Sequence, residues 1–203
     1  MKRLSMFALL AVAATLAAET ASLPSVFSDG MVLQCGQKVP VWGKGAPGER
    51  VTVTFAGQSA AATAGADGRW RVDLAPLAAS KEGREFRVKG ENEVVLRDVL
   101  VGEVWFCSGQ SNMEYPMATY RKIKDWEREV AAANHPTMRY FQSPNKAALT
   151  PQDDIAAKWT AVTPETVPPY SAVAYTFGET LMKELDVPVG LIEASWGGTR
   201  IEP

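Results

Sequence analysis

Hydrophobic and polar positions alternate with a period of two in the first half of the chain and change to helical spacing in the second half. Between residues 23 and 100, short alternating runs separated by glycine-rich turns are typical of β-strands. These runs are 39–42, 51–55, 70–74, 86–88 and 94–96. Asp67-Gly68, just before Trp70, predicts a hairpin. The spacing therefore predicts a small antiparallel β-sandwich of immunoglobulin-like kind over residues 22–100.

Residues 101–114 predict a strand that runs into a sharp turn. The apolar run from Val104 to Phe106 suits a strand covered on both faces, and such strands belong to parallel sheets flanked by helices. Ser111 would then stand at the carboxyl end of the strand, where ligands bind in open α/β sheets. A helix that begins there would offer unpaired N–H groups and a positive dipole end to developing negative charge.

Beyond Ser111, apolar residues recur at steps of three and four and predict a helix, which Asn134-His135-Pro136 ends. The positions on this face are Met117, Tyr120, Ile123, Trp126 or Glu127, Val130 and Ala133. Residues 138–141 predict the next strand.

A second helix is predicted to begin near Ser171, and residues 189–194 predict a third, buried strand. The apolar face of this helix would carry Val173, Phe177, Leu181 and Leu185. Strand, helix, strand, helix, strand is a right-handed βαβαβ unit, so the sheet is parallel. Residues 101–203 are thus expected to form an incomplete α/β/α three-layer domain. Ser111 and Gly197-Gly198 would share one sheet edge.

The segment between residues 142 and 170 is long and rich in proline and polar residues. A structureless loop of this length inside a compact domain is usually functional or a lid. Trp159 is expected to pin it to the core.

The residues around Ser111 allow two interpretations. Gly109 permits a tight turn and Asn112 places a polar side chain close to the hydroxyl, which is typical of a nucleophile. The alternative is an ordinary helix start with Ser111 or Asn112 as the N-cap. Met113 stands where the lipase-type elbow requires a second glycine, so that motif is excluded.

Two separated blocks resemble the sialate O-acetylesterase family of SGNH-type serine esterases. The first is Gly109-Gln110-Ser111-Asn112-Met113, preceded by Gly102-Glu103-Val104-Trp105. The second is Trp196-Gly197-Gly198-Thr199 followed by Ile201-Glu202. The likeness runs from about Leu23 to Pro203.

The resemblance implies that Ser111 is the nucleophile. The N–H groups of Ser111 and of Gly197 or Gly198 would hold the oxyanion, with Gln110 and Asn112 as further candidates for oxyanion or substrate binding. Taken alone, Trp196 to Thr199 would be a plain turn after a strand.

A base for Ser111 is missing from the sequence. His135 is the only histidine, and it does not match the Asp-x-x-His arrangement that the family carries near the end of a longer catalytic domain. Glu114 and Glu193 are weak bases towards a serine hydroxyl. With its end at Pro203, the chain is expected to be the N-terminal part of a longer esterase, inactive as it stands.

Composition narrows the classes of function further. The chain has 46% hydrophobic and 22% charged residues and a formal net charge of −2, which leaves no basic footprint for nucleic acid. One histidine and two distant cysteines give no metal-ligand spacing, and the family resemblance implies no cofactor. Cys35 and Cys107 could form a disulfide, but their apolar, strand-like surroundings favour two buried, unpaired thiols.

Residues 1–21 predict a signal peptide. Lys2 and Arg3 precede an apolar run from Leu4 to Ala18, and small residues crowd the end of this run. No later segment is long and apolar enough to cross a membrane. A periplasmic or extracellular location is expected.

The prediction is a secreted serine carbohydrate esterase that removes O-acetyl groups from sialic acid or a related sugar. One alternative is a non-catalytic secreted protein whose sandwich binds glycan; Trp42 and Trp70 could line such a face, although tryptophan in a sandwich is more often core. Another is the same fold acting on acetylated xylan or another plant polysaccharide. The expected partner is an acetylated sugar, and oligomeric state stays open.

Overall fold

The computed structural model describes residues 20–118 and 123–200. The predicted signal peptide up to residue 19, Tyr120 of the first predicted helix, and the Ile201-Glu202 block lie outside the described residues.

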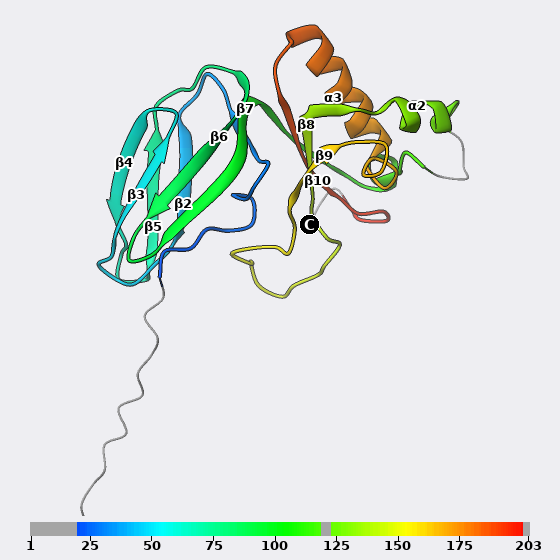
Figure 1. Ribbon diagram of the computed structural model, residues 1–203. Coiled ribbons are helices and arrows are strands. Elements are labelled where there is room, and N and C mark those ends of the chain that lie inside the picture. Colours follow the sequence, from blue (N-terminus) through cyan, green and yellow to red (C-terminus); the bar gives the residue numbers. More distant parts are fainter. Residues whose placement is uncertain (1–19, 119–122, 201–203) are drawn as a thin grey trace, which may run out of the picture.

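The described chain has a mixed α/β fold (Figure 1). Its strands are β1 (Val32–Gln34), β2 (Val39–Lys44), β3 (Arg50–Phe55), β4 (Gln58–Thr63), β5 (Arg69–Leu74), β6 (Ser80–Lys89), β7 (Glu93–Gly109), β8 (His135–Gln142), β9 (Trp159–Val162) and β10 (Val189–Ser195). Its helices are α1 (Ser111–Glu114), α2 (Trp126–Ala132) and α3 (Ala172–Leu185).

One large sheet runs through the molecule in the order β4-β3-β6-β7-β10-β8-β9, and β1 pairs with β7 beside it. The strands from β4 to β7 are antiparallel, whereas β7, β10 and β8 are parallel. β7 belongs to both regions and crosses the predicted boundary at residue 100 without a break (Figure 1). We call the part from residue 20 to residue 102 the antiparallel half, and the remainder the parallel half.

The antiparallel half buries the alternate side chains that the period-two pattern indicates. β3 and β5 both alternate between exposed and buried positions, and Val51, Val53, Phe55 and Trp70 are at most 3% exposed. β2 and β5 form a separate two-stranded sheet whose buried side chains join the same hydrophobic cluster as those of β3 and β6. The strands predicted in this region are therefore confirmed.

The predicted hairpin at Asp67-Gly68 is wrong in one respect. The turn exists, with the Gly68 N–H bonded to the Gly65 carbonyl oxygen at 3.0 Å. The strands on its two sides, β4 and β5, do not pair, because β4 pairs with β3 and β5 pairs with β2. The turn therefore connects two sheets.

The parallel strands and their shared direction are as predicted, but the burial of β7 is not. Trp105 is 43% and Phe106 is 68% exposed. Beyond Gly102 this part of β7 lies at the edge of the sheet, because β10 is the only described strand that pairs with it. α3 packs against β10 through Gly178, and the Trp105 ring meets only Phe177 of this helix among the described aromatic residues, which is itself 38% exposed. A sequence run can predict an apolar strand without specifying what covers it.

The first predicted helix is much shorter than its pattern. Among the described residues of this stretch, only 126–132 are helical. The Met117 N–H donates to the Tyr170 carbonyl oxygen and the Ala118 N–H to that of Pro168, both at 2.9 Å. Pro116 also has no N–H for a helix. At Met117 and Ala118, long-range backbone pairing has therefore replaced the start of the predicted helix.

Helix α3 begins where predicted, but it buries a different face. The Ser171 hydroxyl accepts the Ala174 N–H at 3.1 Å and caps the helix. The buried residues are Ala174, Tyr175 and Gly178, whereas Val173, Phe177 and Leu185 are 50%, 38% and 51% exposed.

Gly178 explains this choice of face. A Cβ at this position would lie 2.7 Å from Leu191 Cδ1. The helix therefore lies against β10 on its small residues.

The segment from residue 142 to residue 170 is tied to the antiparallel half, which argues against a free lid. It contains β9, which pairs with β8. Trp159 pins it as predicted: it is 6% exposed and its Nε1–H donates to the Val26 carbonyl oxygen at 2.8 Å. Asp154 Oδ1 accepts both the N–H and the hydroxyl of Ser25 at 2.8 and 2.7 Å.

Both cysteines are unpaired, as favoured from the sequence; Cys107 is buried and Cys35 is half-buried. Within residues 20–118 and 123–200, no helix has the length and apolar character needed to cross a membrane.

Candidate active site at the carboxyl edge of the parallel strands

The two blocks noted in the sequence meet at one edge of the sheet. β7 and β10 are parallel, and Ser195 at the end of β10 is in register with Gly109 at the end of β7. The Trp196 N–H donates to the Gly109 carbonyl oxygen at 3.0 Å. The turn that carries Ser111 and the turn that carries Gly197-Gly198 are therefore neighbours at the carboxyl edge.

Gly109 allows the sharp turn before Ser111. Its φ is +152°, and a Cβ there would lie 2.7 Å from Met113 Cγ. Ser111 is the first residue of α1, and the N-cap is Gln110, whose side chain makes no capping hydrogen bond. The alternative of Ser111 or Asn112 as N-cap is therefore wrong. The Ser111 hydroxyl instead donates to Gln110 Oε1 at 3.3 Å.

The helix at this turn is only four residues long. The dipole that the sequence led us to expect behind Ser111 is correspondingly small, because few peptide units are aligned. Stabilisation of negative charge here would have to come from individual N–H groups.

Glu114 connects the turns around the site. One of its carboxylate oxygens accepts the Gly197 N–H at 2.6 Å, and the other accepts the Asn145 side-chain amide at 2.6 Å. A methyl group placed on Gly197 would lie 3.6 Å from both Cα and Cβ of Ser111. Gly197 therefore lies beside Ser111, but its N–H is bonded to Glu114. Gly198 has a φ of +82° and no atom within 4 Å of an added Cβ.

Ser111 opens into a cavity of about 710 Å³. This volume is in the range of small-molecule sites. The cavity is lined by Ser111, Glu114, Tyr115, Pro116, Ala118, Gln142, Pro168 and Pro169. Pro168 and Pro169 come from the segment between β9 and α3, so part of the long connection lines the site.

Below the turn, a buried carboxylate organises the end of β10. Glu193 is 2% exposed and accepts the Ser195 N–H at 2.9 Å, and the Ser195 hydroxyl bonds to the same oxygen. Burial raises the pKa of Glu193, the bonds from Ser195 oppose this rise, and the neighbouring charge of Glu114 adds to it. Burial, with a contribution from Glu193, also raises the pKa of Cys107 to about 11. Cys107 therefore stays protonated at neutral pH, which argues against a cysteine nucleophile.

The only histidine of the chain lies at the opposite end of the sheet. His135 begins β8, and Gln142, which lines the cavity, ends it. At about 3.3 Å per residue, these ends are roughly 23 Å apart. His135 Nε2 lies 3.2 Å from both the Tyr175 hydroxyl and Glu179 Oε1. His135 is therefore excluded as the base for Ser111 in this arrangement.

No group of three or more His, Cys, Asp or Glu side chains in the described part of the chain is arranged to hold a metal ion. The chemistry that the site offers is that of a serine hydroxyl, backbone N–H groups and two carboxylates.

Sequence reasoning identified Ser111 and the glycine turn but missed the polar links between them. Glu114 was noted only as a nearby carboxylate, and Asn145 and Ser195 were not singled out. Glu114 directly follows the serine block, so its closeness was readable. Asn145 lies 31 residues from Glu114 in the sequence, and no local pattern could have joined them.

Comparisons with known proteins agree with the resemblance of the two blocks. No family model matches the chain. Sialate O-acetylesterase of Homo sapiens is 36% identical over 205 residues, and that of Pongo abelii is 34% identical over 204 residues; each alignment covers 88% of this chain. A crystal structure of a carbohydrate acetylesterase from Xanthomonas citri superimposes with a TM-score of 0.85 and 39% identity over 90% of this chain.

The chain spans only part of these relatives. The alignments cover 37% of the human and orangutan proteins and 42% of the Xanthomonas citri chain. Over most of its own length, the chain is therefore a homologue of the sialate O-acetylesterases, as the serine and glycine blocks indicated.

Proposed function

We propose that this chain carries the nucleophile of a serine esterase that removes O-acetyl groups from sialic acid or a related sugar. The observation that carries the proposal is the position of Ser111, which lines a cavity of about 710 Å³ just after the carboxyl end of β7, beside Gly197. The names of the relatives, sialate O-acetylesterase and carbohydrate acetylesterase, support ester hydrolysis on an acetylated sugar.

In the proposed reaction, Ser111 Oγ attacks the acetyl carbonyl carbon, the bond from this carbon to the sugar oxygen breaks, and the sugar leaves as an alcohol with the proton that Ser111 lost to a base. Water then cleaves the acetyl-serine, which releases acetate and restores the Ser111 hydroxyl. The N–H groups of Ser111 and of Gly197 or Gly198 receive the negative charge that develops on the carbonyl oxygen. Gly197 can contribute only when Glu114 releases its N–H, so Glu114 would have to swing towards Asn145 during the reaction. Gln110 and Asn112 are proposed to contact the substrate.

Proton removal from Ser111 requires a group that the described residues do not bring to it. His135 lies at the far edge of the sheet, and Glu114 and Glu193 are carboxylates, which are weak bases for a serine hydroxyl. We therefore propose that the 203-residue chain by itself turns over esters very slowly. Loss of one member of a catalytic triad typically costs a factor on the order of 10⁴ to 10⁶.

We further propose that residues 22–100 are an immunoglobulin-like β-sandwich domain and that residues 101–203 are part of an SGNH-type α/β/α domain. The first is supported by the hydrophobic cluster shared by the two sheets, and the second by the parallel strands with Ser111 at their carboxyl edge. A periplasmic or extracellular location is proposed from the basic and apolar N-terminal residues.

A non-catalytic role in glycan binding is the second candidate, and the distance of His135 from Ser111 favours it. Acetylated xylan is an alternative substrate, because the residues that line the cavity do not distinguish one sugar from another.

The test is a chimera in which the aligned part of this chain replaces the matched 37% of the human sialate O-acetylesterase. With O-acetylated sialic acid as substrate, Ser111→Ala should lower kcat by several orders of magnitude and leave KM nearly unchanged. Ser108→Ala is the matched control, because Ser108 is also exposed but donates its hydroxyl to the Ala194 carbonyl oxygen at 2.9 Å. A large loss of kcat in Ser108→Ala, with Ser111→Ala active, would refute the assignment.

The 203-residue chain alone provides a second measurement. Its hydrolysis of p-nitrophenyl acetate should be slow and should not change in Ser111→Ala. A large rate that depends on Ser111 would require a base other than those considered above.

A further inference from the structure

The outer face of the two-stranded sheet carries an exposed tryptophan among charged side chains. In β2, Trp42 and Lys44 alternate with buried residues and point away from the core. On β5, Arg71 lies directly opposite Trp42 and Arg69 lies opposite Lys44. Trp42 is 43% exposed. One indole ring and three cations therefore share this face.

Trp42 and Trp70 have different roles in this sheet. Trp70 is 3% exposed, and its Nε1–H donates to the Lys44 carbonyl oxygen at 2.9 Å. It belongs to the core. The Trp42 ring meets the edge of Phe27, with ring centroids 4.7 Å apart and planes at 76°. This contact holds the ring in place while leaving much of its surface accessible.

This face lines a cavity of about 440 Å³. Residues 22–24, Asp153 and Asp154 also line it, so segments that are distant in sequence meet beside Trp42. The volume is in the range of small-ligand sites, which combine aromatic side chains with a few fixed polar groups.

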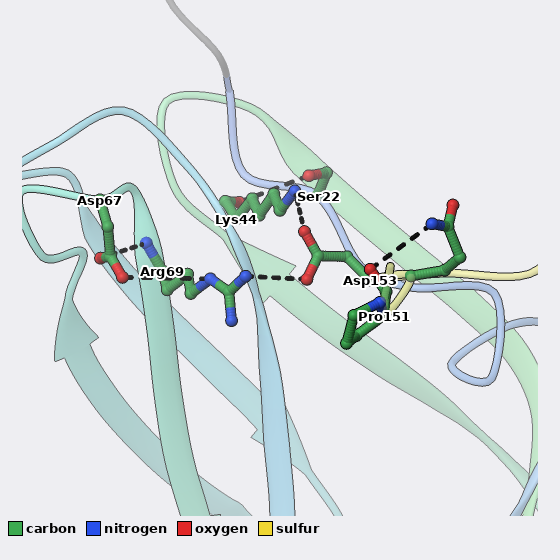
Figure 2. Close-up of polar contacts among 7 residues, drawn as sticks. Ser22, Lys44, Asp67, Arg69, Pro151 and Asp153 are labelled. Atoms are coloured by element: carbon green, nitrogen blue, oxygen red, sulfur yellow. Dashed lines mark hydrogen bonds and ion pairs between the residues drawn. The ribbon is translucent and has the colours of Figure 1, made fainter. Parts of the chain in front are cut away.

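Each cation of the cavity is paired with a carboxylate. Asp153 lies between two cations, 2.7 Å from Lys44 Nζ and 2.8 Å from Arg69 Nη2 (Figure 2). Arg71 pairs with Asp73 at 3.1 Å on the same strand. Because each cation already has a carboxylate, the cavity has no strong demand for an ionic ligand. Its ion pairs are about half exposed and can still form hydrogen bonds with hydroxyl groups.

We propose that this cavity binds a pyranose unit of an uncharged glycan, separately from the site at Ser111. The apolar C–H face of the ring would lie on Trp42. Its hydroxyls, which both donate and accept, would bond to Arg71, Lys44 and Asp153. The cavity could hold a polysaccharide whose acetyl groups are removed elsewhere on the molecule, but binding here does not depend on esterase activity.

The ion pairs of this cavity also have a structural role. Asp153 and Asp154 hold the segment after β8 against the antiparallel half, and Lys44 and Arg69 serve that role without a ligand. Trp42 is outside these ion pairs. A test centred on Trp42 therefore separates ligand binding from attachment of the segment.

The experiment measures binding of xylohexaose, an unacetylated and uncharged oligosaccharide, to the 203-residue chain by saturation-transfer NMR and calorimetry. The wild type should bind, and Trp42→Ala should weaken binding on the order of tenfold or more, as truncation of an aromatic anchor does. Trp105→Ala is the matched control, because Trp105 is also 43% exposed but lies in the parallel half. Arg71→Ala provides a second loss variant in case Trp42→Ala does not fold.

A loss of binding in Trp42→Ala separates this site from the proposed esterase site, because Trp42 does not line the cavity at Ser111. The proposal is overturned if the wild type gives no saturation transfer. It is also overturned if folded Trp42→Ala binds as tightly as Trp105→Ala, or if Arg71→Ala binds like the wild type when Trp42→Ala is unfolded.

Discussion

The two halves of the molecule differ in how completely they cover their apolar side chains. In the antiparallel half, Phe55 and Phe86 are at most 1% exposed and their rings lie 5.5 Å apart. In the parallel half, Trp105 and Phe177 make a similar contact at 5.1 Å, yet they are 43% and 38% exposed. The same kind of aromatic pair is thus core in one half and surface in the other.

This difference shows in which half the hydrophobic pattern of the sequence is sufficient to predict which side chains are buried. In the antiparallel half, each strand buries one face against the shared hydrophobic cluster, so alternation predicts both the strand and its buried face, although not always its partner. A parallel strand needs partners many residues away, and β7 has β10 on one side only beyond Gly102. We therefore expect the two halves to differ in stability.

The largest expected change in the free energy of unfolding follows the removal of a buried aromatic ring from the antiparallel half. Phe86→Ala should lower the free energy of unfolding by about 3–5 kcal/mol, because it removes a fully buried side chain and leaves a cavity. The matched change Phe177→Ala should cost only about 1 kcal/mol, the scale of a partly exposed aromatic pair. Urea unfolding of the two variants measures both values. Equal losses would show that the parallel half is as well packed as the antiparallel half.

The next effect concerns the connection between the halves. Arg139 on β8 is 9% exposed, and its Nη1 lies 2.8 Å from Asp98 Oδ2 on β7. Arg139→Ala should cost about 1–3 kcal/mol, because it breaks a charge-assisted bond whose donor is buried. Asp98 is half exposed, so it can regain water.

Hydrogen exchange would locate this loss. In the wild type, amides of β3 and β6 should exchange more slowly than those of β8 and β10, and Arg139→Ala should accelerate only the latter. Uniform acceleration across all four strands would mean that the halves unfold as one unit.

The fold was predictable wherever local chemistry decides it. The alternation at Val51 to Phe55, the serine cap of α3 and the proline stop after α2 all have causes within a few residues. The face of α3 was not predictable, because it depends on whether Gly178 can lie against Leu191. The segment before α2 was not predictable either, because its backbone bonds go to residues 168 and 170.

In the candidate site, too, features with local causes were predictable and contacts between distant side chains were not. Ser111 and Gly197 could be placed together because both follow strands predicted to be parallel, and carboxyl ends of parallel strands meet at one edge. The bond from Gly197 to Glu114 and the bond from Asn145 to Glu114 depend on side-chain geometry. No spacing in the sequence encodes them.

A smaller effect should appear in the dependence of stability on pH. Burial raises the pKa of Glu193 above its ordinary value of 4.5. The folded state then holds a proton at pH values where the unfolded state has lost it, so this group's contribution to stability falls as pH rises from about 4.5 through the raised pKa. In Glu193→Gln this contribution is absent.

The measurement is thermal unfolding of the wild type and Glu193→Gln between pH 4 and pH 8. The wild type should lose stability relative to the variant as pH rises through the window above 4.5. The pKa values of Asp153 and Asp154 are lowered from their ordinary value of 3.8, so these groups change the stability only below about pH 3.8. Both proteins contain them. A constant difference between the two proteins at every pH would contradict the shift.

The smallest effect on stability, and the one that defines the surface of the parallel half most sharply, is expected for Phe106→Ser. Phe106 is 68% exposed, so its loss should change the free energy of unfolding by less than about 0.5 kcal/mol. Self-association should fall nonetheless, because an apolar side chain next to an uncovered strand edge promotes contact between copies. Sedimentation velocity at increasing concentration measures this, with Leu149→Ser as the control, since Leu149 is fully exposed on a loop away from β7. If Phe106→Ser instead unfolds the protein, Phe106 is covered in solution and the contrast between the two halves no longer holds.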